Sequence, residues 1–228
     1  MAKRPSILRS SLALGAAVGV FGVSFGVIAA SADVPVPMAC AMSLFVFTGA
    51  TQFAAVSVVA SGGSPLSAVG SGLLLGLRHI GYGLALDRTL PPSPRRRLPA
   101  AQFLIDESTA MALAQGNRDD GRRAFWATGL SVFGFWNIGT LVGALFGSVL
   151  GDPATLGLDA VFPAAFLALL VPLVRTGDGR LAAATGALIA VILVPLLAAG
   201  LPIVLAAAGA VPAAVVRRHA NRRGENPR

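Results

Sequence analysis

The chain has 228 residues, of which 55% are hydrophobic and only 12% are charged, and its mean hydropathy is +0.75. These values exclude an ordinary soluble globular domain and a disordered chain alike. The net charge is +8, but the basic residues stand in short clusters at the ends of apolar segments. Because this placement is typical of membrane-protein loops, we expect an integral membrane protein that binds no nucleic acid.

Long apolar segments follow one another along almost the whole chain. One stretch, from Val34 to Leu77, contains no charged side chain, and about 20 apolar residues suffice for one helical crossing of a bilayer. The predicted segments are 10–32, 36–60, 65–86, 99–115, 124–150, 158–174, 181–199 and 201–216. The sequence therefore predicts an all-α fold, a polytopic integral membrane helical bundle with seven or eight transmembrane segments.

The first segment also has features of a secretory signal peptide, because basic residues precede it and Ala30-Ser31-Ala32 end it. Its charge-free run is nevertheless long for a signal core and suits a membrane span. We expect it to be retained. Residues 10–216 would then form a single transmembrane transporter domain between a basic N-terminus (1–9) and a basic tail (217–228).

Clusters of Arg and Lys predict the orientation, since cytoplasmic loops are enriched in both residues. Both termini are basic, so we expect both in the cytoplasm, with the chain multi-pass in a bacterial-type cell (inner) membrane. The turn at Asp33 and the loop with Asp152 and Asp159 contain acidic but no basic residues. These two connections are predicted to lie outside.

One basic cluster, Arg88 with Arg95–Arg97, does not fit a simple order of eight spans. It would lie outside if every segment crossed. Alternatively, one of the segments 36–60 and 65–86 dips in and returns, and segment 99–115 does not fully cross. The sequence leaves this choice open.

Two parts of the chain, about 10–88 and 124–199, share one order of features. Each has a Gly-rich helix that ends in Phe-Gly (Phe25-Gly26 and Phe146-Gly147), then an acidic turn, an apolar segment, a Gly-rich turn and a small-residue helix. Both Phe-Gly pairs would exit outward, so the copies predict a parallel internal repeat. Duplicated halves around a midplane site are common in transporters.

The first and fifth segments carry glycines on one helical face. They are Gly15, Gly19, Gly22 and Gly26 in the first, and Gly139, Gly143 and Gly147 in the fifth. Small residues at these spacings let helices approach closely in lipid. We favour plain helix packing over a sliding or gating interface.

Arg78, His79 and Tyr82 interrupt the segment 65–86. Their spacings place Tyr82 on the same helical face as the other two. Because Arg at a bilayer centre costs roughly 2.5–3.5 kcal/mol on insertion scales, it should pair with an acid or face water. We favour a functional group over an Arg that snorkels from a helix end.

Asp106 and Glu107 form an acidic pair within apolar sequence. They could neutralise Arg78, receive an ammonium group or carry a proton. A surface-lying amphipathic helix with its acids in water is the alternative.

Thr48, Gly49, Thr51 and Gln52 interrupt the segment 36–60. Gly and hydroxyl residues suit a helix break, where freed backbone groups can bind a ligand. A simple polar contact between helices is equally compatible with them. Asn137, in the second repeat, is a weaker candidate of the same kind.

Sequence signatures of enzymes and metal sites are missing. The chain contains no HExxH, GxSxG, P-loop or CxxC pattern. Its single cysteine, Cys40, stands in an apolar run, and His79 and His219 are too far apart to suggest a metal pair. We expect no enzyme, no metal site and no cofactor.

Four segments resemble the AzlC family of branched-chain amino-acid permeases. They are Ser43-Leu-Phe-Val-Phe-Thr-Gly-Ala-Thr-Gln-Phe53, Leu77-Arg-His-Ile-Gly-Tyr-Gly-Leu84, Asp106-Glu107 and Leu156-Gly-Leu-Asp159. The resemblance covers residues from about 10 to 215 and implies export of branched-chain or related amino acids with a small membrane subunit of the AzlD type. It carries over to Thr48, Gly49, Gln52, Phe53, Arg78, His79, Tyr82, Gly83, Asp106 and Glu107. One departure is Gly76, where the family usually has Asn.

Residues and resemblance together predict a secondary transporter that exports a small amino acid and is driven by protons. Each charge of a zwitterion that leaves water needs a partner, so we assign the carboxylate to Arg78 and the ammonium to Asp106 or Glu107. The predicted substrate-binding residues are Thr48, Gln52, Arg78, Tyr82, Asp106, Glu107 and Asn137. His79 and Glu107 are candidate proton carriers. The alternatives are a non-transporting scaffold subunit and an uncoupled channel.

Overall fold

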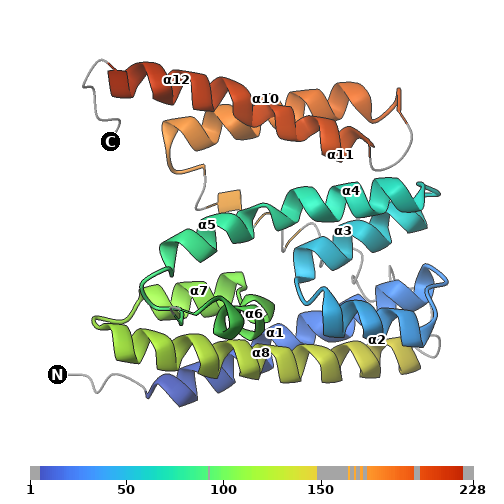
Figure 1. The fold of residues 1–228 in the computed structure, drawn as a ribbon. Helices are drawn as coiled ribbons and strands as arrows, with labels where there is room; N and C mark the ends of the chain where they lie inside the picture. Colours follow the sequence, from blue (N-terminus) through green and yellow to red (C-terminus); the bar gives the residue numbers. More distant parts are fainter. Residues whose placement is uncertain are drawn as a thin grey trace. The chain divides into compact units, whose positions relative to one another are not determined.

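The computed structural model describes residues 6–91, 93–147, 164, 167, 170–171, 174–197 and 201–222. Every regular element in these ranges is a helix (Figure 1), which confirms the predicted all-α class. The helices are α1 (Ile7–Ser31), α2 (Val36–Phe45), α3 (Gly49–Ala60), α4 (Pro65–Gly76), α5 (Arg78–Ala85), α6 (Pro94–Gln102), α7 (Asp106–Leu113), α8 (Arg118–Phe146), α10 (Gly177–Leu193), α11 (Leu201–Ala206), η3 (Ala207–Gly209) and α12 (Ala210–Arg222).

Two of the described helices, α1 and α8, are long and apolar enough to cross a membrane, and α2 and α3 are shorter apolar helices. The predicted number of seven or eight spans therefore stays a prediction. So does the internal repeat, because much of its second copy, including Asp152, Leu156 and Asp159, lies outside the described residues.

The chain divides into two compact units. The first contains Met1–Phe53 and Leu75–Leu158, and the second contains Ala54–Leu74 and Asp159–Arg228. In the second unit, α10 packs closely on η3, where the Thr185 hydroxyl donates to the Gly209 carbonyl at 2.6 Å. All predicted site residues belong to the first unit.

Helices α1 and α8 form the frame of the first unit, and they run parallel. Ser11 shares a buried hydroxyl hydrogen bond of 2.9 Å with Thr128, and further along Gly26 lies against the Thr140 carbonyl, where a Cβ would come within 2.3 Å of the oxygen. The glycine ladders thus meet backbone to backbone, which confirms that they serve close helix packing. Asn117 caps the start of α8, with its side chain accepting from the Asp120 amide.

The predicted segment 36–60 is not one continuous helix. It breaks between α2 and α3, at residues 46–48, where Phe47 has a positive φ of 39°. Along α8, Ser43 meets Thr140 at 3.1 Å, the Phe47 ring meets Phe133 at 4.8 Å, and Gly49 then lies against Trp136. The contacted residue of α8 changes from Thr140 to Phe133 before the break and back toward Trp136 after it. The chain therefore reverses direction at the break. The helix-break interpretation of this segment is confirmed.

The predicted segment 99–115 is also two helices, and it reverses in the same way. Phe103 packs against Gly129, near the middle of α8, whereas the Ala112 carbonyl lies beside Gly121, near its start. Ser108 holds the turn between α6 and α7, since its hydroxyl accepts from the Ile105 amide at 3.1 Å and donates to the Phe103 carbonyl. We call α2–α3 and α6–α7 the first and second hairpin.

The loop after α5 lies at the start of α8. Arg122 Nε donates to the Thr89 carbonyl at 3.4 Å, and Arg97 pairs with Asp87 at 2.8 Å. The cluster at Arg88 and Arg95–Arg97 therefore belongs to the same end of the unit as the basic first turns of α8. The structure favours the alternative in which segment 99–115 does not fully cross. We call this end the basic end.

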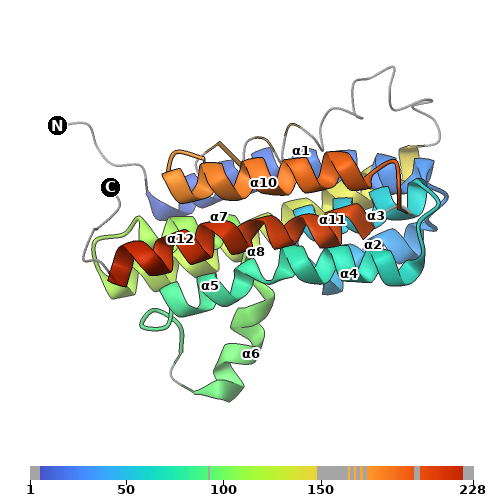
Figure 2. The same cartoon turned by 90° about the horizontal axis from the view of Figure 1, so that it is seen from above.

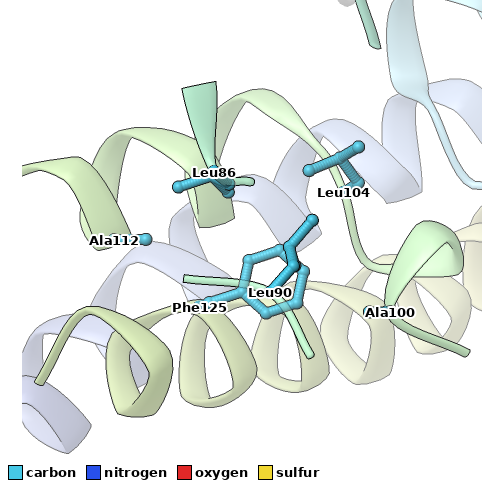
Figure 3. Packing of buried hydrophobic residues seen from close by; sticks show 6 residues of the cluster. All are labelled: Leu86, Leu90, Ala100, Leu104, Ala112 and Phe125. Carbon is cyan, nitrogen blue, oxygen red and sulfur yellow. The ribbon is translucent and has the colours of Figure 1, made fainter. Parts of the chain in front are cut away.

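A small apolar cluster holds the second hairpin together (Figure 3). It combines the loop after α5, both arms of the hairpin and α8. Its members are Leu86, Leu90, Ala100, Leu104, Ala112 and Phe125, with Tyr82, Phe103 and Trp126 packed around them.

Candidate functional site

Three helix starts converge at one point of the first unit. Arg78 is the first residue of α5, Asp106 is the first residue of α7, and Thr48 directly precedes α3. One guanidinium nitrogen of Arg78 donates to Thr48 Oγ1 at 3.0 Å and lies 3.1 Å from Asp106 Oδ2. Arg78 thus joins the turn of the first hairpin to the turn of the second.

The point of convergence lies halfway along α8. Phe47 and Phe103, from the two hairpin turns, both pack on Phe133, with ring centroids 4.8 Å and 5.5 Å away. Phe133 stands at the centre of α8, whose bounds are Arg118 and Phe146. If α8 spans a bilayer, the ion pair is therefore far from both water layers.

Both oxygens of the Asp106 carboxylate are occupied. Oδ2 meets Arg78, and Oδ1 accepts a hydrogen bond from the Tyr82 hydroxyl. The Arg78 and Asp106 side chains are only 22% and 28% exposed. The alternative of a surface helix with its acids in water is therefore wrong for Asp106.

Glu107 follows Asp106 in the first turn of α7, where the helix dipole favours a negative charge. Its side chain is half-buried. Within the described ranges no cation lies within ion-pair distance of Glu107, whereas Asp106 has Arg78. Glu107 is therefore the acid of the pair that is available to another charge or to a proton.

His79 lies next to Tyr82, with ring centroids 5.6 Å apart. Its Nδ1 is 2.8 Å from the Gly76 carbonyl. Since a carbonyl only accepts, Nδ1 is the donor of this hydrogen bond. The contact also uses the backbone of the position where the family usually has Asn.

Gln52 lies one helical turn after Thr48 and is fully buried. Neither its amide nitrogen nor its amide oxygen finds a hydrogen-bond partner in the described part of the chain, and the same holds for Arg78 Nε and Trp136 Nε1. A buried polar group without a partner costs about 1–3 kcal/mol. Of the polar atoms in this region, these would gain most from a hydrogen bond to a polar substrate.

Asn137 is not brought to this cluster by any hydrogen bond. Its amide nitrogen donates to the Phe133 carbonyl, on its own helix, at 2.8 Å. Four of the predicted site residues are thus linked by direct contacts: Thr48, Arg78, Tyr82 and Asp106. Glu107 and Gln52 lie near them because each is close in sequence to one of the four. Among the residues that it describes, no group of three or more His, Cys, Asp or Glu could hold a metal ion.

Sequence reasoning missed two kinds of residue at the site. Phe47 and Phe103 were given no role, but their rings meet edge to face between the two hairpin turns, with ring centroids 6.4 Å apart. Gln102 was not singled out, although its side chain links the two hairpins. One signal was available, because each Phe stands within three residues of a polar helix start, Thr48 or Asp106.

The sequence is similar to those of several known membrane proteins. The chain is 30% identical over 176 residues to an uncharacterized membrane protein of Helicobacter pylori strain J99, covering 75% of this chain and 76% of that protein. It is 29% identical over 168 residues to the branched-chain amino acid transport protein AzlC of Bacillus subtilis, covering 72% and 63%. It is 31% identical over 137 residues to the inner membrane protein YgaZ of Escherichia coli K12, covering 57% and 56%. No solved structure matches the chain.

The family described as AzlC protein matches residues 13–150. This range contains both hairpins, α8, most of α1 and every predicted site residue. Because the match covers more than half of the chain, the protein belongs to the AzlC family.

Proposed function

We propose that this protein is a membrane transporter that exports small amino acids, branched-chain ones above all, with proton coupling and with a small membrane subunit of the AzlD type. One observation carries the proposal. Arg78 bridges Thr48 and Asp106 where two helix breaks meet, halfway along an apolar helix. The name of the Bacillus relative supports the substrate class.

The ion pair suits a zwitterion. An isolated charge in a low-dielectric site is costly, but Arg78 and Asp106 neutralise each other when no substrate is present. An amino acid can insert between them, with its carboxylate on Arg78 and its ammonium on Asp106. Every charge then keeps a partner, so both the empty and the loaded site are balanced.

The neighbouring groups would orient the substrate and carry protons to and from the site. The uncommitted amide of Gln52 can bond to either end of the substrate backbone, and the Tyr82 hydroxyl can follow Asp106 or the ammonium. Glu107 and His79 are the proposed proton carriers, because the first lacks an ion-pair partner in the described chain and the second uses only its Nδ1 in a hydrogen bond there. Asn137 stays a candidate whose hydrogen bond in the described chain goes to the Phe133 carbonyl of its own helix.

The distribution of side chains supports a multi-pass membrane orientation. Helices of the first unit expose large apolar residues such as Val20, Leu84 and Ile138, which are 65%, 74% and 63% exposed. Such surfaces are stable in lipid and not in water. The basic end of this unit would face the cytoplasm, and with it the start of α1.

Counterflow in proteoliposomes tests the proposal. Purified protein, alone and with a small membrane subunit, is expected to exchange labelled valine or leucine, faster across a pH gradient. Arg78→Ala should lower the exchange at least tenfold, whereas Arg123→Ala, a surface Arg with a side chain 78% exposed, should not. A protein that moves no amino acid in either form would be a scaffold, and flux without pH dependence would indicate a channel.

A further inference from the structure

We propose that Thr109 and Trp136 are two further substrate-binding residues, one for each end of the bound amino acid. The Thr109 hydroxyl accepts from the ammonium group beside Asp106, and the Trp136 indole N–H donates to the carboxylate beside Arg78. Neither Thr109 nor Trp136 belongs to the predicted substrate-binding set. This inference rests on the proposed function and deepens it, because it names groups that recognise an α-amino acid at the same site.

Buried polar atoms without a hydrogen-bond partner gather around Arg78. In the part of the chain that the structure describes, such side-chain atoms belong to Gln52, Arg78, Thr109, Trp136 and Ser131. Ser131 stands apart, since it is half-buried and lies beside Gly15 at the contact of α1 and α8. In native proteins nearly all buried polar groups are hydrogen-bonded. Several unbonded groups around one ion pair therefore indicate a place where a polar solute binds.

The two hairpins carry these groups in the same order. In the first, Thr48 bonds to Arg78, and the fully buried Gln52 follows one helical turn later. In the second, Asp106 pairs with Arg78, and Thr109 follows one helical turn later. Side chains on a helix lean toward its N-terminus, so Gln52 and Thr109 each lie over the turn that contacts Arg78. Thr109 is therefore the counterpart of Gln52 in the second hairpin.

Helix α8 shields Thr109 from its surroundings. Figures 1 and 2 show α7 lying alongside α8, and a Cβ on Gly121 would lie 3.2 Å from the Ala112 carbonyl oxygen. Thr109 precedes Ala112 by three residues and shares its face of α7. Thr109 is only 4% exposed. Its hydroxyl is thus out of reach of bulk water, and a bound solute can supply the hydrogen bond that it lacks.

The chemistry of the Thr109 hydroxyl suits an ammonium group. An ammonium group brings three N–H donors. Asp106 alone does not satisfy them, because its Oδ1 already accepts from the Tyr82 hydroxyl and its Oδ2 lies 3.1 Å from Arg78. A hydroxyl oxygen is an acceptor with two lone pairs. Thr109 therefore adds an acceptor one turn from the carboxylate that attracts the ammonium group.

Trp136 is packed on its carbon atoms but not bonded at its nitrogen. A Cβ on Gly49 would lie 2.8 Å from its Cη2. The Phe25 ring stacks on the indole and the Phe53 ring meets it edge to face, both with ring centroids 6.2 Å away. Trp136 is 4% exposed, yet Nε1 has no acceptor in the described chain. A buried indole N–H usually has one.

The indole N–H suits a carboxylate, because it can only donate. Gly49, which lies on the indole, directly follows Thr48, the residue that bonds to Arg78. Arg78 Nε is a second donor without a partner in the described ranges. The two oxygens of a carboxylate offer about four lone-pair sites and can accept from both donors. Donors near Thr48 and acceptors near Asp106 thus match the two ends of an amino acid.

Thr109→Val tests the ammonium contact, since it replaces the hydroxyl with a methyl group of similar size. We expect the KM for valine in counterflow to rise about tenfold. The melting temperature should stay the same or rise, because the hydroxyl has no partner to lose in the described chain. Thr109→Ser should keep the KM within about threefold. The matched control is Thr128→Val, which breaks the buried bond to Ser11. It should lower the melting temperature by a few degrees and leave the KM unchanged.

A spectroscopic measurement tests the carboxylate contact. The chain has two tryptophans, so Trp126→Phe leaves Trp136 as the only one. In this variant valine should shift the ultraviolet resonance Raman band that reports hydrogen bonding of the indole N–H. Adding Arg78→Ala should abolish the shift. Trp136→Phe should raise the KM about tenfold, whereas Trp126→Phe should not.

The outcomes separate this inference from the proposed function. If the parent protein exchanges no amino acid, the proposed function fails and the inference fails with it. If the parent exchanges valine but Thr109→Val keeps its KM, or melts as low as Thr128→Val, the assignment of Thr109 is overturned. A Raman band that valine does not shift would overturn the assignment of Trp136.

Discussion

Replacing Asp106 with Asn keeps the size of the side chain and removes the charge that faces Arg78. Loss of one partner of a fully buried ion pair costs 3–5 kcal/mol, and exposed pairs are worth about 0–1 kcal/mol. Since the two side chains are 22% and 28% exposed, we expect Asp106→Asn to lose about 2 kcal/mol of folding stability. Loss of the ammonium partner at a similar cost would raise the KM for valine roughly thirtyfold.

A double variant separates the two effects. Arg78→Gln with Asp106→Asn restores neutrality, so its melting temperature in detergent should recover most of what Asp106→Asn loses. Its counterflow should nevertheless be absent, because neither charge of the substrate has a partner. Recovery of transport in the double variant would refute the assignment of Arg78 and Asp106 to the substrate. Wild-type stability of Asp106→Asn would refute the magnitude assigned to the ion pair.

Three further variants follow from the same contacts. Tyr82→Phe loses the hydrogen bond to Asp106, worth about 1 kcal/mol, and should raise the KM about fivefold and lower the melting temperature by a few degrees. Gln52→Leu removes a buried amide without partners in the described chain and should melt at the same or a higher temperature, yet exchange at least tenfold more slowly. Normal exchange would exclude Gln52 from the site. Gly143→Ala, whose new Cβ meets the Val23 carbonyl at 2.1 Å, should lower melting by several degrees, whereas Gly134→Ala, with open space around it, should not.

The frame and the chemistry of the site were readable from the sequence for definite reasons. Glycines at spacings of three and four have one main use in apolar helices, which is close packing, but the spacing did not tell that α1 and α8 pack on each other. A lone Arg in apolar sequence needs an acid, and Asp106 and Glu107 were the only pair available. The structure shows that Asp106 is the partner of Arg78.

The hairpins were only partly readable. Thr48-Gly49 signals a break, but Phe103, Leu104 and Ile105 are apolar and carry no such signal. That turn depends on Ser108, which bonds backward to the Phe103 carbonyl and the Ile105 amide. The hydrophobicity of a sequence window shows how long an apolar segment is, but not whether the chain reverses within it. It therefore predicted segment 99–115 as one element.

The parallel contact between α1 and α8 has a consequence for biogenesis. Ser11 and Thr128 are 117 positions apart, so the glycine face of α1 enters the bilayer long before its partner has been synthesised. Until then that face is a groove without a neighbour, and contacts of such sequence separation form late. Substitutions along α8 should accordingly lower the amount of protein that survives membrane quality control. They should do so even where the transport rate of each surviving molecule is unchanged.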